Sequence, residues 1–276
     1  FLHAMDKKKD ATVFMAVPTI YYTFLRRKSE FREKAKKWGK TRLFTCGSAP
    51  IRPEVLPEIE DIIHNHIVNR YGMTESHVIT SLPLTGPFKQ GSVGLPLYGV
   101  ELKLVAENGI ALSRGNTEKN GTPLVGEVHI RGNILFHHYW NNEDTTQKAF
   151  NKEGFFLTGD LGYLDPDGFL TLVGRKDDLI IVSGENVYPP IIERVLNESN
   201  QVYESAVIGV PDHVTGEKIV AIIVPNKQFD ARALEQYCAK MLAHYQQPAR
   251  FELVKELPRN TMGKVLKRVL KKQYSV

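Results

Sequence analysis

The sequence predicts an α/β fold: part of a large α/β plus β-barrel domain, followed by a small α+β carboxyl-terminal domain. Before residue 90, apolar strands alternate with amphipathic helices, a pattern typical of a parallel sheet. From Gly91 onward, short strands of period two indicate a small antiparallel sheet or a distorted barrel. We expect the large domain at residues 1–174, with α/β structure to about 90 and a small β-barrel at about 91–174. The small domain is expected at residues 175–276.

The first part of the chain carries the strand, helix, strand pattern of a βαβ unit. Its apolar runs are continuous, as in strands buried on both faces of a sheet. Ligands of such sheets bind beyond the carboxyl ends of the strands, where two polar turns fall, at residues 47–50 and 72–76. The expected elements are strands over residues 12–17, 42–46 and 67–71, a helix over 20–40 and a second helix that starts near Pro53.

A charged link, Gly174-Arg-Lys-Asp-Asp178, joins two apolar strands. A solvated link of this kind is expected at a domain boundary, and an ordinary charged hairpin is the alternative. The residues after the link predict a compact α+β module of about 100 residues. The expected elements are helices from Pro189, after a cap at Asp230 and from Gly263-Lys264, and strands over 205–210, 218–224 and 251–254.

The composition is that of a globular protein. Apolar residues make up 42% of the chain and charged residues 24%, and the formal net charge is +5. That charge is compatible with an anionic ligand and does not call for nucleic acid. Cys46 and Cys238 lie far apart, which favours a reducing, intracellular setting, with the cytoplasm preferred and the mitochondrion left open. No apolar run reaches transmembrane length, and nothing predicts the oligomeric state.

Two acidic strand ends carry candidate ligand groups. Thr74 and Glu75 offer a hydroxyl and a carboxylate that suit Mg²⁺ bound partly through nucleotide phosphates. The alternative is a helix start capped by Thr74. Asp160 follows Thr158-Gly159, and its carboxylate can accept the hydroxyls of a ribose, although the same residues also fit a common turn.

Three further spots carry polar or small residues that suit a phosphorylated ligand. Arg175 offers a planar fork for phosphate or ribose oxygens. Ser183-Gly184 allows a ligand to approach the backbone closely. Lys264 follows Gly263 near the carboxyl terminus, and the alternative for it is one more solvated lysine in a basic tail.

Taken in order, these motifs resemble those of the acyl-adenylate-forming (AMP-binding) enzymes, which include acyl-CoA synthetases. Within that family, residues 14–21, 70–75 and 258–264 look most like the malonyl-CoA synthetases. The matching stretches are Gly47-Ser48-Ala49-Pro50, Tyr71-Gly72-Met73-Thr74-Glu75, residues 126–132 with Tyr139-Trp140, Thr158-Gly159-Asp160, Gly174-Arg175 and residues 258–264.

The resemblance implies a two-step ligase reaction. ATP and a small carboxylic acid would give an acyl-AMP and pyrophosphate, and CoA would then displace AMP to form a thioester. Lys264 would bridge the α-phosphate and the attacking carboxylate, where negative charge develops. The resemblance also implies that Glu75 binds Mg²⁺, that Thr74 binds the phosphates and that Asp160 and Arg175 bind the ribose. It places a hinge at Asp177 and the CoA tunnel at Ser183 and Gly184. The residues implied to line the adenine and acyl pockets are Gly47, Ser48, Ala49, Pro50, Tyr71, Gly72 and Met73.

The substrate is predicted from the resemblance to malonyl-CoA synthetases, which places Tyr21 and Arg70 at the acyl group. Arg70 precedes Tyr71 on a strand, so the two side chains should point to opposite faces. If Arg70 reaches the acyl pocket, its guanidinium would pair with the second carboxylate of a dicarboxylate such as malonate. If it turns away to the surface, a general medium- or long-chain fatty acyl-CoA synthetase is the alternative.

The family's glycine-rich phosphate loop has no counterpart in this sequence. We therefore expect the chain to correspond to the carboxyl-terminal portion of such an enzyme and to be inactive alone. An adenylating enzyme that serves a carrier protein and a non-catalytic nucleotide-binding fragment are the remaining alternatives. Glu75, Asp160 and Lys264 speak against the fragment, because a module without chemistry has no need of all three.

Overall fold

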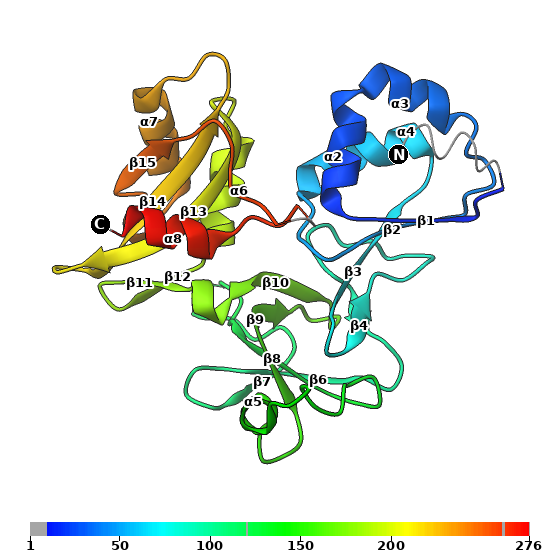
Figure 1. The fold of residues 1–276 in the computed structure, drawn as a ribbon, viewed down its shortest axis with the longest axis horizontal. Helices are drawn as coiled ribbons and strands as arrows, with labels where there is room; N and C mark the ends of the chain where they lie inside the picture. The colour runs from blue at the N-terminus through cyan, green and yellow to red at the C-terminus, as the bar shows by residue number, and fades with distance from the viewer. Residues whose placement is uncertain (1–9, 120, 261–262, 276) are drawn as a thin grey trace. The chain divides into compact units, whose positions relative to one another are not determined.

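The computed structural model describes residues 10–119, 121–260 and 263–275 (Figure 1). The chain divides into two compact units, one of Phe1–Thr158 with Gly162–Leu172 and one of Gly159–Leu161 with Val173–Val276. Both units combine helices with sheets, which confirms the predicted α/β class. Within the described ranges, no helix has both the length and the apolar character needed to pass through a bilayer.

The first sheet of the first unit is mixed. Strands β1 to β3 are parallel, with Ala16 opposite Cys46 and Cys46 opposite Asn69, so their carboxyl ends share one edge. Strands β4 and β5 continue the sheet in antiparallel fashion. In spatial order the strands are β1 (Val13–Ala16), β2 (Leu43–Cys46), β3 (Ile67–Met73), β4 (His77–Ser81) and β5 (Leu95–Pro96).

The helices beside this sheet bury an aromatic core that includes Phe14, Phe24 and Phe31. The predicted single helix over residues 20–40 is wrong, because the chain leaves helical geometry at Arg27, with φ −115° and ψ 46°. In a continuous helix, residues seven apart are separated by about 10.5 Å along the axis. The break brings the rings of Phe24 and Phe31 to a centroid distance of 5.1 Å. The elements are α2 (Pro18–Arg26), α3 (Lys28–Ala35), η1 (Pro53–Val55) and α4 (Leu56–Ile63).

The second sheet of the first unit corrects the expectation of a small barrel. Its strand order is β10-β9-β8-β6-β7, and in the described residues the two edge strands β10 and β7 do not pair, so the sheet is open. Closure requires the first and last strands to bond across the barrel, which strand periodicity does not report. The elements are β6 (Glu101–Val105), β7 (Ala111–Leu112), β8 (Gly126–Arg131), α5 (Glu143–Ala149), β9 (Phe156–Leu164) and β10 (Leu170–Arg175).

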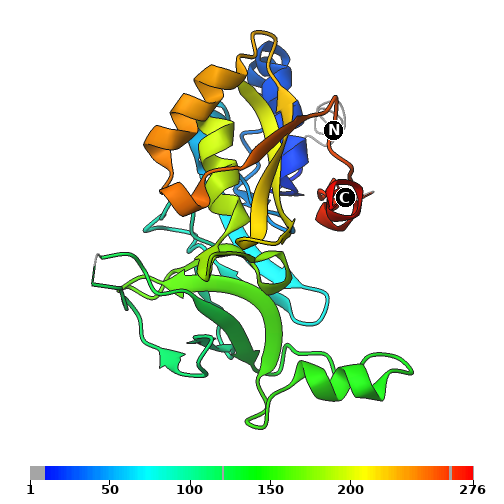
Figure 2. The same ribbon diagram turned by 90° about the vertical axis from the view of Figure 1, so that its left-hand side faces the viewer.

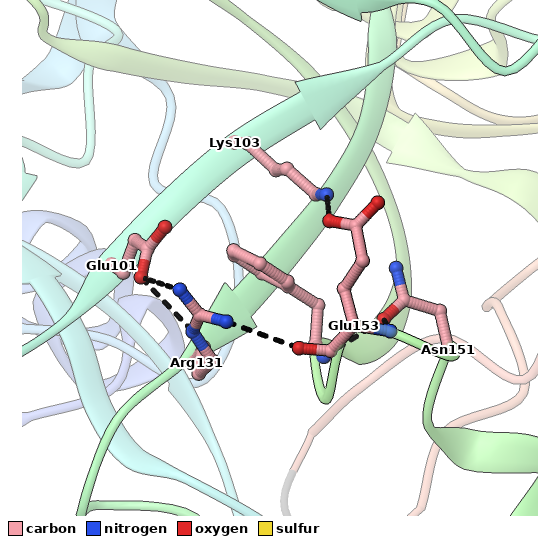
Figure 3. A network of polar contacts seen from close by, with 6 residues as sticks. Glu101, Lys103, Arg131, Asn151 and Glu153 are labelled. Atoms are coloured by element: carbon pink, nitrogen blue, oxygen red, sulfur yellow. Dashed lines mark hydrogen bonds and ion pairs between the residues drawn. The ribbon is translucent and has the colours of Figure 1, made fainter.

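Charged side chains fasten the loop before β9 to this sheet (Figure 3). The Arg131 guanidinium donates to Glu101 Oε2 at 2.6 Å and to the Glu153 carbonyl at 3.1 Å. The Lys103 ammonium pairs with the Glu153 carboxylate and lies 4.0 Å from the centroid of the Phe155 ring. The loop therefore enters β9 in a fixed register, and β9 carries Thr158, Gly159 and Asp160.

The second unit is a sheet with helices on both faces (Figure 2). Alternate residues of β13 and β14 face in opposite directions: Val207 and Ala221 pack with α6 and α7, whereas Ile208 and Ile222 pack with Leu270 of α8. The elements are η2 (Lys176–Asp178), β11 (Ile180–Val182), β12 (Glu185–Val187), α6 (Pro189–Glu198), β13 (Val202–Asp212), β14 (Gly216–Pro225), α7 (Ala231–Met241), η3 (His244–Gln246), β15 (Arg250–Leu253) and α8 (Lys267–Tyr274).

Candidate functional site

The candidate acyl site lies at the carboxyl edge of the parallel strands in the first unit. Tyr21 stands on α2, the helix that follows β1, and residues 47–50 form the loop that follows β2. Arg70 comes one residue after Asn69, which pairs with the last residue of β2. Three segments that are separate in the sequence therefore meet at this edge.

Tyr21 is part of the wall of this edge. Its side chain is buried, and its hydroxyl donates to the Thr45 carbonyl at 3.0 Å. Burial raises the pKa of Tyr21, as does the nearby Cys46, while the positive charge of Arg70 acts in the opposite direction. The hydroxyl therefore keeps its proton and donates a hydrogen bond to the Thr45 carbonyl of β2.

Arg70 packs over Gly47. A Cβ atom added at Gly47 would lie 3.2 Å from Arg70 Cγ and 3.4 Å from Arg70 Nε, so the glycine leaves room for the guanidinium stem. The arginine is partly buried, and no carboxylate of the described residues forms an ion pair with it. Ser48, next in the loop, has φ +69°, a conformation that non-glycine residues adopt at a cost of about 1–3 kcal/mol.

Tyr71 has different surroundings from those of Arg70. Its ring is buried against Ile79, Leu104 and Val128, in the core beside the second sheet. This agrees with the alternation expected for neighbours on a strand. The structure thus gives Tyr71 a packing role, and its predicted contact with the nucleotide stays a prediction.

Gly72 is required by the backbone. The β3–β4 pairing shifts register between Tyr71 and Gly72, and a Cβ atom at Gly72 would lie 1.8 Å from the His77 carbonyl oxygen. No side chain fits at that distance. The close approach of β4 therefore explains Gly72 whether or not a nucleotide binds beside it. Met73 is the last residue of β3.

Thr74 and Glu75 lie in a hairpin turn between β3 and β4, and not at the helix start that was the alternative. The Glu75 carbonyl accepts the Phe136 amide at 2.8 Å, and Glu75 Oε1 accepts the Tyr139 hydroxyl at 3.0 Å. Burial and the Glu75 carboxylate raise the pKa of Tyr139. Tyr139 thus holds one oxygen of Glu75 in place. No role was predicted for Tyr139 itself, although Tyr139-Trp140 lies in a motif of the resemblance.

The donor set at this turn fits a magnesium ion that is shared with phosphates. Across the residues that the structure describes, no three His, Cys, Asp or Glu side chains gather into a metal site. Mg²⁺ in phosphoryl-transfer sites takes one or two carboxylates and completes its shell with phosphate oxygens and water. Glu75, with the exposed hydroxyl of Thr74 beside it, meets that requirement.

The predicted ribose pair comes together in the second unit. Arg175 Nε lies 3.6 Å from Asp160 Oδ1, and the Asp160 side chain is largely buried. Gly159 has φ +69°, and a Cβ atom there would lie 3.2 Å from Arg175 Nη2. The carboxylate and the guanidinium therefore stand side by side, as a shared contact to vicinal hydroxyls requires.

The remaining predicted residues also lie in the second unit. Asp177 is in η2, where its carbonyl accepts from Lys271 Nζ at 3.2 Å. Ser183 and Gly184 have φ +52° and +86° and form the two-residue turn of the β11–β12 hairpin, for which two positive φ angles are typical. The Lys264 side chain is exposed. Thr261 and Met262 of the same motif lie outside the described residues.

Comparison with known proteins identifies the family of this chain. A family model described as AMP-binding enzyme matches residues 1–140, and one described as AMP-binding enzyme C-terminal domain matches residues 191–264. The chain is 34% identical to the malonate–CoA ligase of Arabidopsis thaliana over 286 residues, which are 97% of this chain and 45% of that protein. It is 37% identical to a long-chain-fatty-acid–CoA ligase of Yersinia pestis over 232 residues, 83% of this chain and 40% of that protein.

The similarity extends to solved structures. The ATP-bound structure of MatB from Rhodopseudomonas palustris matches with a TM-score of 0.90 and 36% identity, over 100% of this chain and 53% of that chain. The chain spans about half the length of the relatives that it matches. The resemblance to acyl-adenylate-forming enzymes is confirmed, and the chain belongs to the AMP-binding enzyme family.

Proposed function

We propose that the protein carrying this chain is an ATP-dependent acid–thiol ligase that converts a short dicarboxylic acid into its CoA thioester. The observation that supports the substrate class is Arg70: a partly buried guanidinium at the carboxyl edge of the sheet, with no ion-pair partner among the described residues. Burying such a charge is costly without a counter-charge. A second carboxylate on the substrate supplies that counter-charge.

The proposed reaction has two steps, and each step forms one bond and breaks one. In the first step, a carboxylate oxygen of the acid attacks the α-phosphorus of ATP, the bond to pyrophosphate breaks, and an acyl-AMP forms. In the second step, the CoA thiolate attacks the acyl carbon, the bond to AMP breaks, and the thioester forms. Bound Mg²⁺ would neutralise phosphate charge during the first step.

Each proposed residue has a role suited to its chemistry. Glu75 would hold the metal ion, with its carboxylate oriented by Tyr139. Asp160 and Arg175 would hold the ribose from adjacent positions. Lys264 would place a cation where negative charge develops between the α-phosphate and the attacking carboxylate, a position at which a fixed charge is most effective.

The names of relatives do not decide between acyl chains. A malonate–CoA ligase and a long-chain-fatty-acid–CoA ligase match the chain at 34% and 37% identity. A general fatty acyl-CoA synthetase is therefore the second candidate. An apolar chain laid against Arg70 would leave the guanidinium desolvated and unpaired, which disfavours that candidate.

Replacing Arg70 with leucine is expected to lower kcat/KM for malonate about 10²-fold, the cost of a lost charge-assisted contact. Octanoate should be used poorly by the wild type and no worse by the variant. The measurement is the rate of CoA thioester formation with malonate, methylmalonate and octanoate in the full-length enzyme.

Arg42→Leu is the matched control, because Arg42 is exposed and lies just before β2, at the amino end of the strand. It should leave the kinetic constants for all three acids unchanged. A wild type that prefers octanoate, or malonate use that is indifferent to Arg70→Leu, would leave a general acyl-CoA synthetase as the function.

A further inference from the structure

Backbone contacts link residues 258–260 to residues 263–266, which include Lys264. Arg259 forms an isolated bridge with Val265, and the Leu266 amide donates to the Pro258 carbonyl at 2.8 Å. Asn260 holds both polar groups of the Lys264 backbone. The Asn260 backbone amide donates to the Lys264 carbonyl at 3.0 Å, and the Asn260 side-chain Oδ1 accepts the Lys264 backbone amide at 2.9 Å.

Arg259 ties residue 263, just before Lys264, to the sheet of the second unit. Its Nη1 donates to the Gly263 carbonyl at 2.7 Å, and its Nη2 pairs with the carboxylate of Glu204 on β13. One guanidinium therefore joins the residue immediately before Lys264 to a strand of the core. Planar two-point contacts of this kind hold orientation as well as distance.

A second anchor fixes the chain on the other side of Lys264. Lys267 Nζ lies 2.7 Å from Glu193 Oε1, and the same carboxylate oxygen accepts the Val207 amide of β13 at 2.8 Å. Both charged side chains of that pair are mostly buried. Leu270 of α8 is 1% exposed and packs against the same sheet.

The Lys264 side chain differs from its surroundings. It is exposed, and no carboxylate of the described residues pairs with its ammonium group. The backbone is thus held from both sides while the charge stays available. Such an arrangement is expected where the backbone of a lysine must be fixed and its ammonium group must contact a ligand.

We infer that Arg259, through Glu204, is a positioning residue that orients Lys264 for acyl-AMP formation. This inference rests on the proposed function, because it concerns the step in which Lys264 would act. Arg259 itself need not touch the substrates. Its loss should leave ATP binding intact and misplace one cation, and a small misplacement of a reacting group can cost about 10²-fold in rate.

The test uses the full-length enzyme with Arg259→Met, Glu204→Gln, the double variant and Arg259→Lys. Single-turnover formation of acyl-AMP should fall about 10- to 100-fold in each of the first three. The double variant should be no slower than the slower single variant, because both remove one contact. KM for ATP, thioester formation from supplied acyl-AMP and the unfolding midpoint should stay unchanged. Arg259→Lys should recover part of the rate.

Arg194→Met is the matched control, since Arg194 forms an ion pair with Glu198 at 4.0 Å on α6, in the same unit. It should leave both steps unchanged. If Lys264→Ala abolishes acyl-AMP formation and Arg259→Met does not slow it, the positioning role is wrong and the proposed function stands. If Lys264→Ala itself has no effect, the role proposed for Lys264 fails first. An equal loss in both steps, or a lowered unfolding midpoint, would make Arg259 merely structural and overturn the inference.

Discussion

Replacing Lys264 with alanine is expected to slow acyl-AMP formation about 10²- to 10³-fold, the usual effect of removing one preorganised group that stabilises a transition state. Thioester formation from supplied acyl-AMP should change little. The reason is that negative charge concentrates at the α-phosphate in the first step, whereas the second step releases AMP as a leaving group. The two rates are measured separately, by single-turnover acyl-AMP formation and by thioester formation from synthetic acyl-AMP.

Lys240→Ala serves as the control for Lys264→Ala. Lys240 is also an exposed lysine of the second unit, in the last turn of α7. Its replacement should leave both rates as they are in the wild type. If Lys264→Ala slowed both steps by the same factor, the lysine would not act on the first transition state, and the role assigned to it would have to be abandoned.

Replacing Gly72 with alanine is expected to lower the free energy of unfolding by about 3 kcal/mol, within the range for overpacked sites. The new Cβ would stand 1.8 Å from the His77 carbonyl oxygen, a backbone atom that cannot rotate away. The β3–β4 hairpin would have to shift, and that hairpin carries Thr74 and Glu75. Urea unfolding measures the change as a lower midpoint at an unchanged slope.

Gly39→Ala is the comparison for Gly72→Ala, because a Cβ at Gly39 meets no atom within 4 Å. That variant should be as stable as the wild type or slightly more so. A Gly72→Ala protein of wild-type stability would show that the close approach to His77 does not explain the glycine. Its predicted place beside the nucleotide would then be the better explanation.

Local sequence signals predicted most of the fold. Apolar runs ending in polar turns gave the parallel strands β1 to β3, and Asp230 caps α7 as expected, accepting the amides of Arg232 and Ala233. These features depend on neighbours in the sequence. The helix α5 also has local signals, a cap at Asn142 with acidic residues after it, but none of its residues is buried, so no apolar periodicity marks it.

Features that depend on distant contacts were not predictable in the same way. Strand periodicity cannot distinguish the open second sheet from a closed barrel, because closure depends on two edge strands far apart in the chain. The expected strand over residues 67–71 continues to Met73 because β4 pairs with it through a register shift at Gly72. A turn that reads as a helix start therefore becomes a hairpin.

The candidate site shows the same division. Residue types and order indicated Glu75, Asp160 and Lys264 from the sequence. The partners that orient these side chains lie too far away in the sequence for any local pattern to reveal them. Tyr139 reaches Glu75 across 64 positions, and Arg259 reaches Glu204 across 55.

Carboxylate-dependent exchange of labelled pyrophosphate into ATP is the most direct test of acyl-AMP formation. The full-length protein, supplied with malonate, ATP and Mg²⁺, should catalyse this exchange, and added CoA should convert malonate into malonyl-CoA. Omitting the acid or the metal should abolish the exchange. Exchange that proceeds without any carboxylate, or ATP cleavage in which no acyl-AMP can be trapped with malonate or any other acid, would contradict the proposed acyl-activating function.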